Sequence, residues 1–470
     1  MTHRIEQIRT GIKASRASVT YAEVTKVLGL IVEIAGFGDA LSIGAMVTLR
    51  PDDGRKIPCE VVGFKDGHAM LMPFGTLEGV GLGCRAEISA NRPFVCPDES
   101  WLGRVVDALG RPLDGKGPLS VGEEAMPYRT SPPPAHSRQR MGEKLDLGVR
   151  AVNTFLSTCR GQRMGIFAGS GVGKSVLLSM MARYTEAEIS VIGLVGERGR
   201  EVQEFIEDDL GPEGLARSVV IVATGDEPPL MRRQAAYLTL AVAEYFRNRG
   251  NDVLCMIDSV TRFAMALREI GLSTGEPPTT KGYPPTTFSE LSRLLERAGP
   301  GMKGQGSITA IFTVLVEGDD HNEPISDAVR GIIDGHIVMD RAIADRGRYP
   351  AIDILRSVSR SMPQCLDADQ WSVVRRAKEL VSTYEDMAEL IRLGAYRKGS
   401  DAKVDEAIRY YDAINRFLAQ NKDERTSMAE GFALLGGILE GNGSGGSSSR
   451  GVAVDEKGRP LHPQDPRNRK

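Results

Sequence analysis

Short apolar stretches alternate with turn-forming residues between residues 21 and 95 of the chain. The stretches are rich in aliphatic side chains and are separated by Gly, Asp and Pro; they cover 29–34, 46–49, 60–64 and 69–73. Turn signals at this frequency are typical of a small all-β domain. The pattern therefore predicts an N-terminal β-barrel domain over 21–95.

From about residue 150 to 345, apolar runs alternate with segments of helical periodicity. The predicted strands and one long helix cover, in chain order, 163–168, 189–195, 218–224, 230–247 (the helix), 253–258 and 308–316. Strands that alternate with helices form βαβ units, which place the strands side by side in a parallel sheet. We therefore predict a central α/β domain over 96–372 with a mostly parallel sheet.

Helical periodicity dominates the chain after residue 372. Apolar positions in 373–380, 384–392 and 406–419 follow helical spacing, which predicts a helical C-terminal domain over 373–440. Residues 441–470 begin GNGSGGSSSRG and contain few apolar side chains. Such a segment buries too little surface to offset the entropy of ordering, so a disordered tail is predicted.

The N-terminal segment 1–20 is basic and has isoleucines at helical spacing. Four basic side chains oppose one acidic side chain, and Ile5, Ile8 and Ile12 fall on one face of a helix. The segment is compatible with an amphipathic helix that docks on a partner protein. A frayed terminus accounts for it equally well.

Composition narrows the class of protein. The 470 residues are 41% hydrophobic and 26% charged, with a formal net charge of -3 and a pI near 6.2. These values suit a globular protein of two or three domains and do not indicate a generally basic nucleic-acid binder. The longest central apolar run, 308–316, is too short to cross a bilayer, and residues 1–16 lack the apolar core of a signal peptide.

The six cysteines form no C-x-x-C pair. A zinc or redox motif is therefore not indicated, and six cysteines in so long a chain are not a disulfide framework. We interpret them as buried thiols in a reducing cytoplasm.

A phosphate-binding loop follows the predicted strand 163–168. Its residues, Gly169, Ser170, Gly171, Val172, Gly173, Lys174 and Ser175, are followed by a helical pattern over 176–184, the context that a Walker A motif requires. The glycines let backbone N–H groups surround phosphate oxygens at the positive end of the helix. Lys174 is expected to reach the β- and γ-phosphates of ATP, and the Ser175 hydroxyl to bind Mg²⁺. Ala168 stands where the consensus begins with glycine, which is tolerable where φ is negative.

Two carboxylates are candidates for the rest of the site. Asp258 ends the apolar strand 253–258, where a Walker B carboxylate would hold Mg²⁺; a helix cap is the alternative. Glu197 lies just past the strand 189–195, at the edge of a parallel sheet where ligands bind. It is a candidate to orient and activate the attacking water, with a solvated loop charge as the alternative.

Five motifs occur together along the chain: AGSGVGKS, GERGREV, DSVTRFA, GYPPTTFSEL and YPAIDILRSVSR. Their order resembles that of the catalytic subunits of rotary ATP synthases and their secretion relatives, over roughly residues 20–440. The segments LGRVVDALGRPLDGKGPL and VMDRAIADRGRYPAIDILRSVSRSMP most resemble the flagellar type III export ATPases. Virulence-injectisome ATPases are close relatives. The resemblance implies a RecA-like central domain that binds ATP and Mg²⁺.

The resemblance also implies roles for single residues. Glu197 matches the glutamate that polarises the hydrolytic water, and Arg198 matches the arginine beside it. Asp258 matches the Walker B aspartate. Arg360 matches an arginine finger that enters the site of a neighbouring subunit, and Tyr349 matches an aromatic residue that stacks on adenine. Outside this context, Arg360 would be a surface arginine and Tyr349 a packing residue.

The partners implied by the resemblance are a homo-hexameric ring, a stator-like regulator bound to residues 1–20, export chaperones with their substrates, and a membrane export gate. The implied location is the cytoplasmic face of the inner membrane, at the base of the flagellar export apparatus, with export acting in concert with the proton gradient. No nucleic-acid partner is expected.

Two alternative interpretations assign the protein to other functional classes. One is a ring-shaped RNA-dependent motor, although residues 21–95 hold few aromatic side chains and no basic-aromatic run of the kind that binds single strands. The other is a ring subunit that binds nucleotide without turnover, against which the intact Lys174, Glu197 and Asp258 argue.

Overall fold

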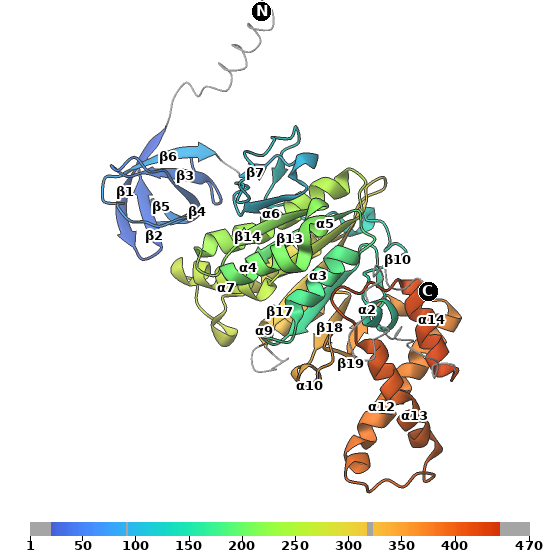
Figure 1. The fold of residues 1–470 in the computed structure, drawn as a ribbon. Coiled ribbons are helices and arrows are strands. Elements are labelled where there is room, and N and C mark those ends of the chain that lie inside the picture. Colours follow the sequence, from blue (N-terminus) through green and yellow to red (C-terminus); the bar gives the residue numbers. More distant parts are fainter. Residues whose placement is uncertain (1–19, 91–92, 317–322, 442–470) are drawn as a thin grey trace, which may run out of the picture.

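The computed structural model describes residues 20–90, 93–316 and 323–441. Apart from Thr20, the predicted partner-binding segment 1–20 lies outside the described residues, as does the predicted disordered tail beyond residue 441. The described chain forms a β-barrel, a large sheet with helices against it, and a projecting group of helices (Figure 1). This arrangement confirms the predicted fold class.

The N-terminal barrel is a closed antiparallel sheet with the strand order β1-β2-β5-β4-β3-β6. Its strands are β1 (Tyr21–Leu28), β2 (Ile31–Ala35), β3 (Met46–Arg50), β4 (Ile57–Lys65), β5 (His68–Pro73) and β6 (Arg85–Ala90). Alternate residues of β3 point inward, so that Val47 and Leu49 are fully buried between more exposed neighbours. The apolar runs predicted β2 to β5, whereas β1 and β6 emerge only in the closed barrel.

A connecting region leads from the barrel to the large sheet. It contains β7 (Phe94–Val95), η1 (Glu99–Trp101), β8 (Arg104–Asp107), β9 (Met126–Pro127), η2 (Ala135–Ser137), β10 (Lys144–Leu145) and β11 (Thr158–Cys159). A buried ion pair between Glu60 of β4 and Arg233 fastens the barrel to the large sheet's helices. Arg129 of the connecting region reaches the same carboxylate, 3.3 Å away.

The large sheet has the strand order β19-β18-β12-β17-β15-β13-β14-β8, and β16 pairs with β17 beside this path. Its further strands are β12 (Arg163–Ala168), β13 (Ile189–Val195), β14 (Ser218–Ala223), β15 (Val253–Asp258), β16 (Gly299–Pro300), β17 (Ser307–Leu315), β18 (Gly335–Met339) and β19 (Ile352–Ser359). The strands from β18 to β8 are parallel, whereas β16 and β19 are antiparallel to their neighbours. The predicted mostly parallel sheet is therefore confirmed.

Helices cover both faces of this sheet. They are α2 (Arg150–Phe155), α3 (Lys174–Tyr184), α4 (Gly199–Glu204), the π-helical turn η3 (Phe205–Leu210), α5 (Gly211–Ala216), α6 (Pro229–Asn248), α7 (Val260–Ser273), η4 (Thr280–Gly282), α8 (Pro285–Glu296), α9 (Pro324–Ile332), α10 (Arg341–Asp345) and α11 (Met362–Cys365). Alternate residues of the central strands β12, β17, β15, β13 and β14 enter different hydrophobic clusters, one with α6 to α9 and the other with α3. Burial on both faces explains why these strands are continuously apolar.

The cysteines correct the expectation that all six are buried. Cys59, Cys159 and Cys255 are buried, whereas Cys84, Cys96 and Cys365 are partly exposed.

Three helices follow the sheet: α12 (Ala368–Arg392), α13 (Ala402–Leu418) and α14 (Met428–Leu439). Asp367, Asp401 and Ser427 cap their N-termini with side-chain hydrogen bonds. The hairpin of α12 and α13 projects away from the sheet (Figure 1). Within the described residues, no helix combines the length and the apolar character needed to cross a membrane.

Candidate functional site: a phosphate loop at the carboxyl edge of the sheet

The loop between β12 and α3 lies at the carboxyl edge of the parallel sheet. Gly171 and Gly173 have φ angles of 78° and 88°, a conformation that favours glycine over residues with a Cβ atom. Ala168 instead ends β12 in extended conformation, paired with Leu315 and Met339. An alanine in place of the consensus glycine therefore causes no backbone strain.

Three residues from neighbouring strands and the loop meet at this edge. Nζ of Lys174 donates hydrogen bonds to Oε1 of Glu197, 3.1 Å away, and to Oδ1 of Asp258. Asp258 also accepts a hydrogen bond of 2.6 Å from the hydroxyl of Thr313 on β17. The parallel order β12-β17-β15-β13 brings these groups together, because the carboxyl ends of all four strands meet at one edge.

The positive charge on Lys174 is stabilised by the carboxylates of Asp258 and Glu197. Burial disfavours the ammonium ion, but the negative charges of Asp258 and Glu197 outweigh that effect and raise the pKa of Lys174. The side chain is therefore a cation at neutral pH. A buried, fixed cation at a glycine-rich loop is suited to binding phosphate oxygens.

A cavity of about 710 Å³ opens beside this cluster. The predicted residues among those that line it are Gly169, Ser170, Gly171, Gly173, Lys174, Ser175, Glu197 and Arg198. Three other predicted residues do not line it: Ala168 and Val172 are buried in the hydrophobic core, and Asp258 lies behind Lys174. Arg198 lies at the rim, where its side chain is 87% exposed and 3.8 Å from Glu201.

Tyr349 and Arg360 also lie outside the lining of the cavity. The ring of Tyr349 borders the loop, since a Cβ atom on Gly173 would lie 3.4 Å from its Cδ1 atom. Arg360 follows β19 and is exposed; its guanidinium donates a hydrogen bond of 3.4 Å to the carbonyl of Arg330. The fold thus brings Tyr349 to the loop but does not bring Arg360 into the cavity of its own chain.

Two arginines that the sequence analysis did not select also line the cavity. Arg262 of α7 has a buried Nε atom for which the described residues supply no hydrogen-bond partner. Arg341, the first residue of α10, donates a hydrogen bond of 2.8 Å to the carbonyl oxygen of Ser170 in the loop. Both arginines follow the carboxyl end of a sheet strand, β15 and β18, and that position is the signal that would have identified them.

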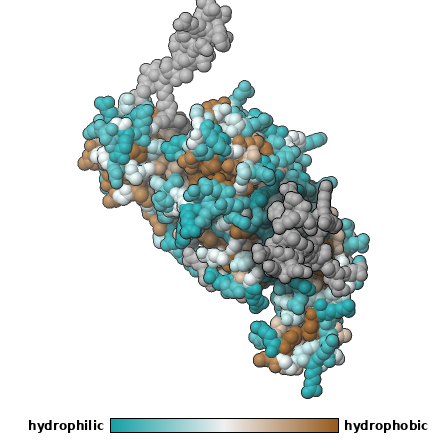
Figure 2. All heavy atoms as spheres, viewed as in Figure 1, coloured by the Kyte–Doolittle hydropathy of each residue, from teal (hydrophilic) through white to brown (hydrophobic). Residues whose placement is uncertain are grey.

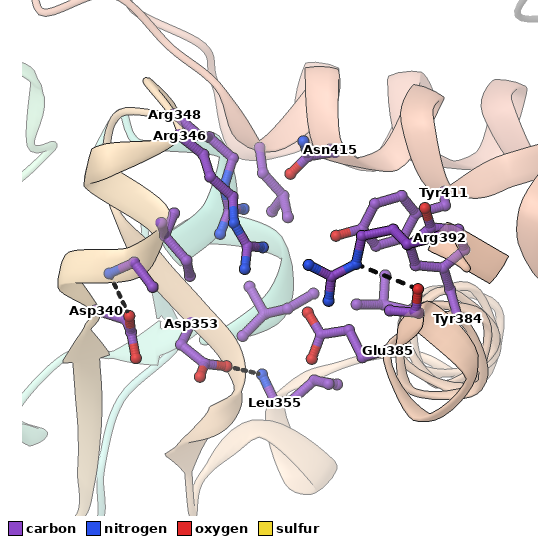
Figure 3. Close-up of a pocket in the computed structure, with 16 residues that line it drawn as sticks. Asp340, Arg346, Arg348, Asp353, Leu355, Tyr384, Glu385, Arg392, Tyr411 and Asn415 are labelled. Carbon is purple, nitrogen blue, oxygen red and sulfur yellow. Dashed lines mark hydrogen bonds between the residues drawn. The ribbon is translucent and has the colours of Figure 1, made fainter. Parts of the chain in front are cut away.

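A second cavity, of about 510 Å³, lies between the sheet and the helices α12 and α13. Figure 3 shows side chains of both signs around it, among them Arg346, Asp353 and Glu385. Its far wall includes the rings of Tyr384 and Tyr411, stacked 3.6 Å apart. This cavity contains none of the predicted site residues. It shares α10 with the first cavity, because Ala342 and Ile343 face it while Arg341 lines the other.

The parallel sheet, the glycine-rich loop at its carboxyl edge and the lysine-carboxylate cluster define a P-loop nucleotide-binding protein with a RecA-like core. Two family models match the chain. The ATP synthase alpha/beta family, nucleotide-binding domain, matches residues 148–359, and the T3SS EscN ATPase C-terminal domain matches residues 366–436. The chain belongs to the ATP synthase alpha/beta family and, within it, to the flagellar type III export ATPases.

Individual relatives agree with this placement. The chain is 57% identical to a flagellum-specific ATP synthase of Caulobacter vibrioides, over 89% of this chain and 96% of the relative. It is 48% identical to that of Bacillus subtilis, over 88% and 94%, and 46% identical to a type 3 secretion system ATPase of Xanthomonas euvesicatoria, over 89% and 94%. The solved structure of the assembled ATPase EscN of enteropathogenic E. coli superimposes with a TM-score of 0.82 at 37% identity, covering 89% of this chain and all of that one.

Proposed function

We propose that this protein hydrolyses Mg-ATP and that the hydrolysis energises protein export through a flagellar type III system. The observation that carries the catalytic part is the hydrogen-bonded cluster of Lys174, Glu197 and Asp258 beside the phosphate loop. Family membership supports the export part, because the flagellum-specific relative from Caulobacter vibrioides is 57% identical over 89% of this chain.

In this proposal the loop amides and Lys174 hold the triphosphate, and Glu197 orients and polarises the attacking water. Its carboxylate lies 3.1 Å from Nζ of Lys174, so the water would be held next to the γ-phosphate. Arg262 supplies a second cation, since its partnerless buried Nε belongs to a side chain that lines the same cavity. The ring of Tyr349 lies beside Gly173, and in this proposal it stacks on adenine.

The donor atoms near the loop fit Mg²⁺. Ser175 lines the cavity at the start of α3, and Asp258 ends β15 behind Lys174. Hydroxyl and carboxylate oxygens are the ligands that this ion prefers in proteins. When bound, Mg²⁺ neutralises negative charge on the phosphate oxygens.

We further propose that the protein acts as a homo-hexamer in which Arg360 completes the site of a neighbouring subunit. Arg360 is exposed and does not line the cavity of its own chain, as a residue that acts across an interface requires. A guanidinium supplied there would stabilise charge on the transferred phosphoryl group. The solved relative EscN is an assembled ATPase, and a second structure of it contains its central stalk EscO.

The remaining partners follow from the same family membership. A stator-like regulator would bind residues 1–20, and chaperones would deliver export substrates to a membrane gate at the base of the flagellar apparatus, which places the protein on the cytoplasmic side. A stalk-like partner would contact the α12–α13 hairpin. Figure 2 shows hydrophobic surface on this hairpin, where Leu390, Leu393 and Ile408 are exposed.

The deciding experiment measures phosphate release from ATP by the purified, assembled protein, with and without Mg²⁺. Turnover that requires Mg²⁺ supports the catalytic proposal, and absence of both nucleotide retention and phosphate release refutes it. Deletion of the gene separates the export systems: loss of flagellar filaments supports the flagellar assignment, whereas loss of effector secretion with intact flagella would assign the protein to an injectisome.

A further inference from the structure

Two buried threonines lie within the apolar strand β17. Thr309 and Thr313 are four positions apart, so their side chains point to the same face of the sheet. A buried hydroxyl costs free energy unless it forms a hydrogen bond. The Thr309 hydroxyl, near the start of the strand, accepts a hydrogen bond of 2.9 Å from the backbone N–H of Gly161. Its role is therefore to satisfy the backbone at the edge of the sheet opposite the phosphate loop.

The Thr313 hydroxyl has a different partner. Near the carboxyl end of β17, it donates a hydrogen bond of 2.6 Å to Oδ1 of Asp258. Strand order brings the two residues together, because β17 lies between β12, which leads into the phosphate loop, and β15, which ends at Asp258. The carbonyl oxygen of Ile257 lies 3.4 Å from the same hydroxyl, beyond the usual length of such a bond. The carboxylate is therefore the main partner of this hydroxyl.

Two donors bind the same oxygen of Asp258. Nζ of Lys174 donates a hydrogen bond to Oδ1, and the hydroxyl of Thr313 donates another. The terminal torsion of an aspartate side chain has a broad energy minimum, so an unrestrained carboxylate rotates easily. Two donors on one oxygen restrict this rotation and give the buried carboxylate a defined orientation.

The two donors differ in what else they can bind. Lys174 lines the nucleotide cavity, and in the proposed function it also binds phosphate oxygens. Thr313 is fully buried and does not line the cavity, so its hydroxyl cannot reach a nucleotide. The hydrogen bond from Thr313 can therefore stay in place when Lys174 engages a phosphate.

We propose that Thr313 is a positioning residue that holds Asp258 in the orientation in which its carboxylate binds Mg²⁺. The inference rests on the proposed function, in which Asp258 is a ligand of that ion. Thr313 itself is not a ligand and acts only through its hydrogen bond to Asp258. Removing a hydrogen-bond partner of a metal ligand typically lowers metal affinity by roughly 10–100-fold.

The test measures how binding of a fluorescent ADP analogue to the purified full-length protein depends on the Mg²⁺ concentration. Thr313→Val keeps the shape of the side chain and removes the hydroxyl. In this variant the Mg²⁺ concentration for the half-maximal effect should rise ~10-fold or more, whereas binding in EDTA should not change. Thr313→Ser, which keeps a hydroxyl, should stay close to the wild type. Thr313→Ala also lacks the hydroxyl and should show the same shift, so it serves as a second variant if Thr313→Val does not fold.

Thr309→Val is the matched control, because it removes a buried hydroxyl from the same face of the same strand without touching Asp258. It should keep the Mg²⁺ dependence of the wild type, even if thermal unfolding shows it to be less stable. An equal shift in Thr309→Val would overturn the role of Thr313, because general loosening of β17 would then explain the effect. Wild-type Mg²⁺ dependence in Thr313→Val would overturn it as well.

A double-mutant comparison tests whether Thr313 acts through Asp258. Adding Thr313→Val to Asp258→Ala should cause no further change in Mg²⁺ dependence, since the bond is already lost. A further ~10-fold loss in the double variant would contradict the proposal. Failure of the proposed function gives a distinct result: nucleotide binding by the wild type would not respond to Mg²⁺ at all, which would refute the metal site and the role of Thr313 together.

Discussion

Nζ of Lys174 lies 3.1 Å from Oε1 of Glu197 and donates a hydrogen bond to it. The cation that we expect to hold phosphate and the carboxylate that we expect to act on water are therefore direct partners. A neutral residue in place of either Lys174 or Glu197 removes a charge from the same small cluster. The two substitutions should nevertheless impair different steps. The contrast between them is the sharpest test of the site.

Replacing Lys174 with alanine should weaken nucleotide binding and abolish most turnover. The substitution removes a buried cation and leaves Asp258 and Glu197 without their partner. Loss of a charged phosphate contact is expected to reduce kcat/KM by ~10²-fold or more. Phosphate release and binding of a fluorescent ATP analogue measure the two effects. Wild-type activity in this variant would refute the assignment of the phosphate loop.

Replacing Glu197 with glutamine should preserve binding of Mg-ATP and remove hydrolysis. The amide keeps the size of the side chain but cannot accept a proton from water, which is worth ~10²–10⁴-fold in rate. Equilibrium binding and single-turnover hydrolysis distinguish the two steps. Glu204→Gln is the matched control, because Glu204 lies a short distance along the chain, at the end of α4, but pairs with the exposed Arg200. If both variants turn over at the same rate, Glu197 is not the catalytic group.

Mixing two inactive variants tests whether Arg360 acts across an interface. Lys174→Ala and Arg360→Ala should each be inactive alone, the latter by ~10³-fold if Arg360 is a finger. Mixed rings contain some interfaces with both native residues, so part of the activity should return. Each variant mixed with itself is the control. A mixture that assembles but stays as inactive as its components would contradict the proposed role.

Replacing Arg341 with alanine should raise the KM for ATP more than it lowers kcat. Its hydrogen bond to Ser170 helps to hold the loop in shape, and the side chain lines the same cavity. One charged hydrogen bond of this kind is worth ~1.5–3 kcal/mol, or roughly 10–100-fold in affinity. Steady-state kinetics measure both constants. Arg346→Ala, which changes the other cavity, is the control and should leave the KM unchanged.

The ion pair between Arg104 and Asp114 at the edge strand β8 should make the stability of the fold depend on pH in the acidic range. Arg104 donates hydrogen bonds of 2.7 and 2.9 Å to the Asp114 carboxylate, and Val105 of β8 donates another of 3.0 Å. The hydrogen bonds from Arg104 hold the pKa of Asp114 well below its usual value of 3.8. A carboxylate whose pKa is lower in the folded chain than in the unfolded chain stabilises the fold. The stabilisation is complete above the pKa of the unfolded chain and decreases progressively below it.

Asp114→Asn should therefore lower the free energy of unfolding by ~2 kcal/mol at pH 7, and the difference from the wild type should shrink as the pH falls below about 4. Urea unfolding followed by tryptophan fluorescence measures both. Asp53→Asn is the control, because Asp53 pairs with Arg55 on the surface, where an ion pair contributes little. Equal effects of the two substitutions would mean that the pair does not stabilise β8.

The elements that local patterns predicted lie close to the observed ones. The predicted strands 163–168, 189–195 and 253–258 are β12, β13 and β15 to the residue, because strands buried on both faces are continuously apolar. The segments 373–380 and 384–392 proved to be one helix, α12. The three residues between them include no glycine or proline, so nothing there ends a helix. The pattern located the apolar faces but not the continuity of the backbone.

The sequence alone determined the phosphate loop, the strands and helices with clear apolar patterns, and the identity of Lys174, Glu197 and Asp258 as candidates. Those properties are local, because they depend on residue type and spacing. Only the tertiary structure decided that Arg262 and Arg341 line the same cavity. Such contacts depend on strand order in the sheet, which joins segments that no local pattern relates.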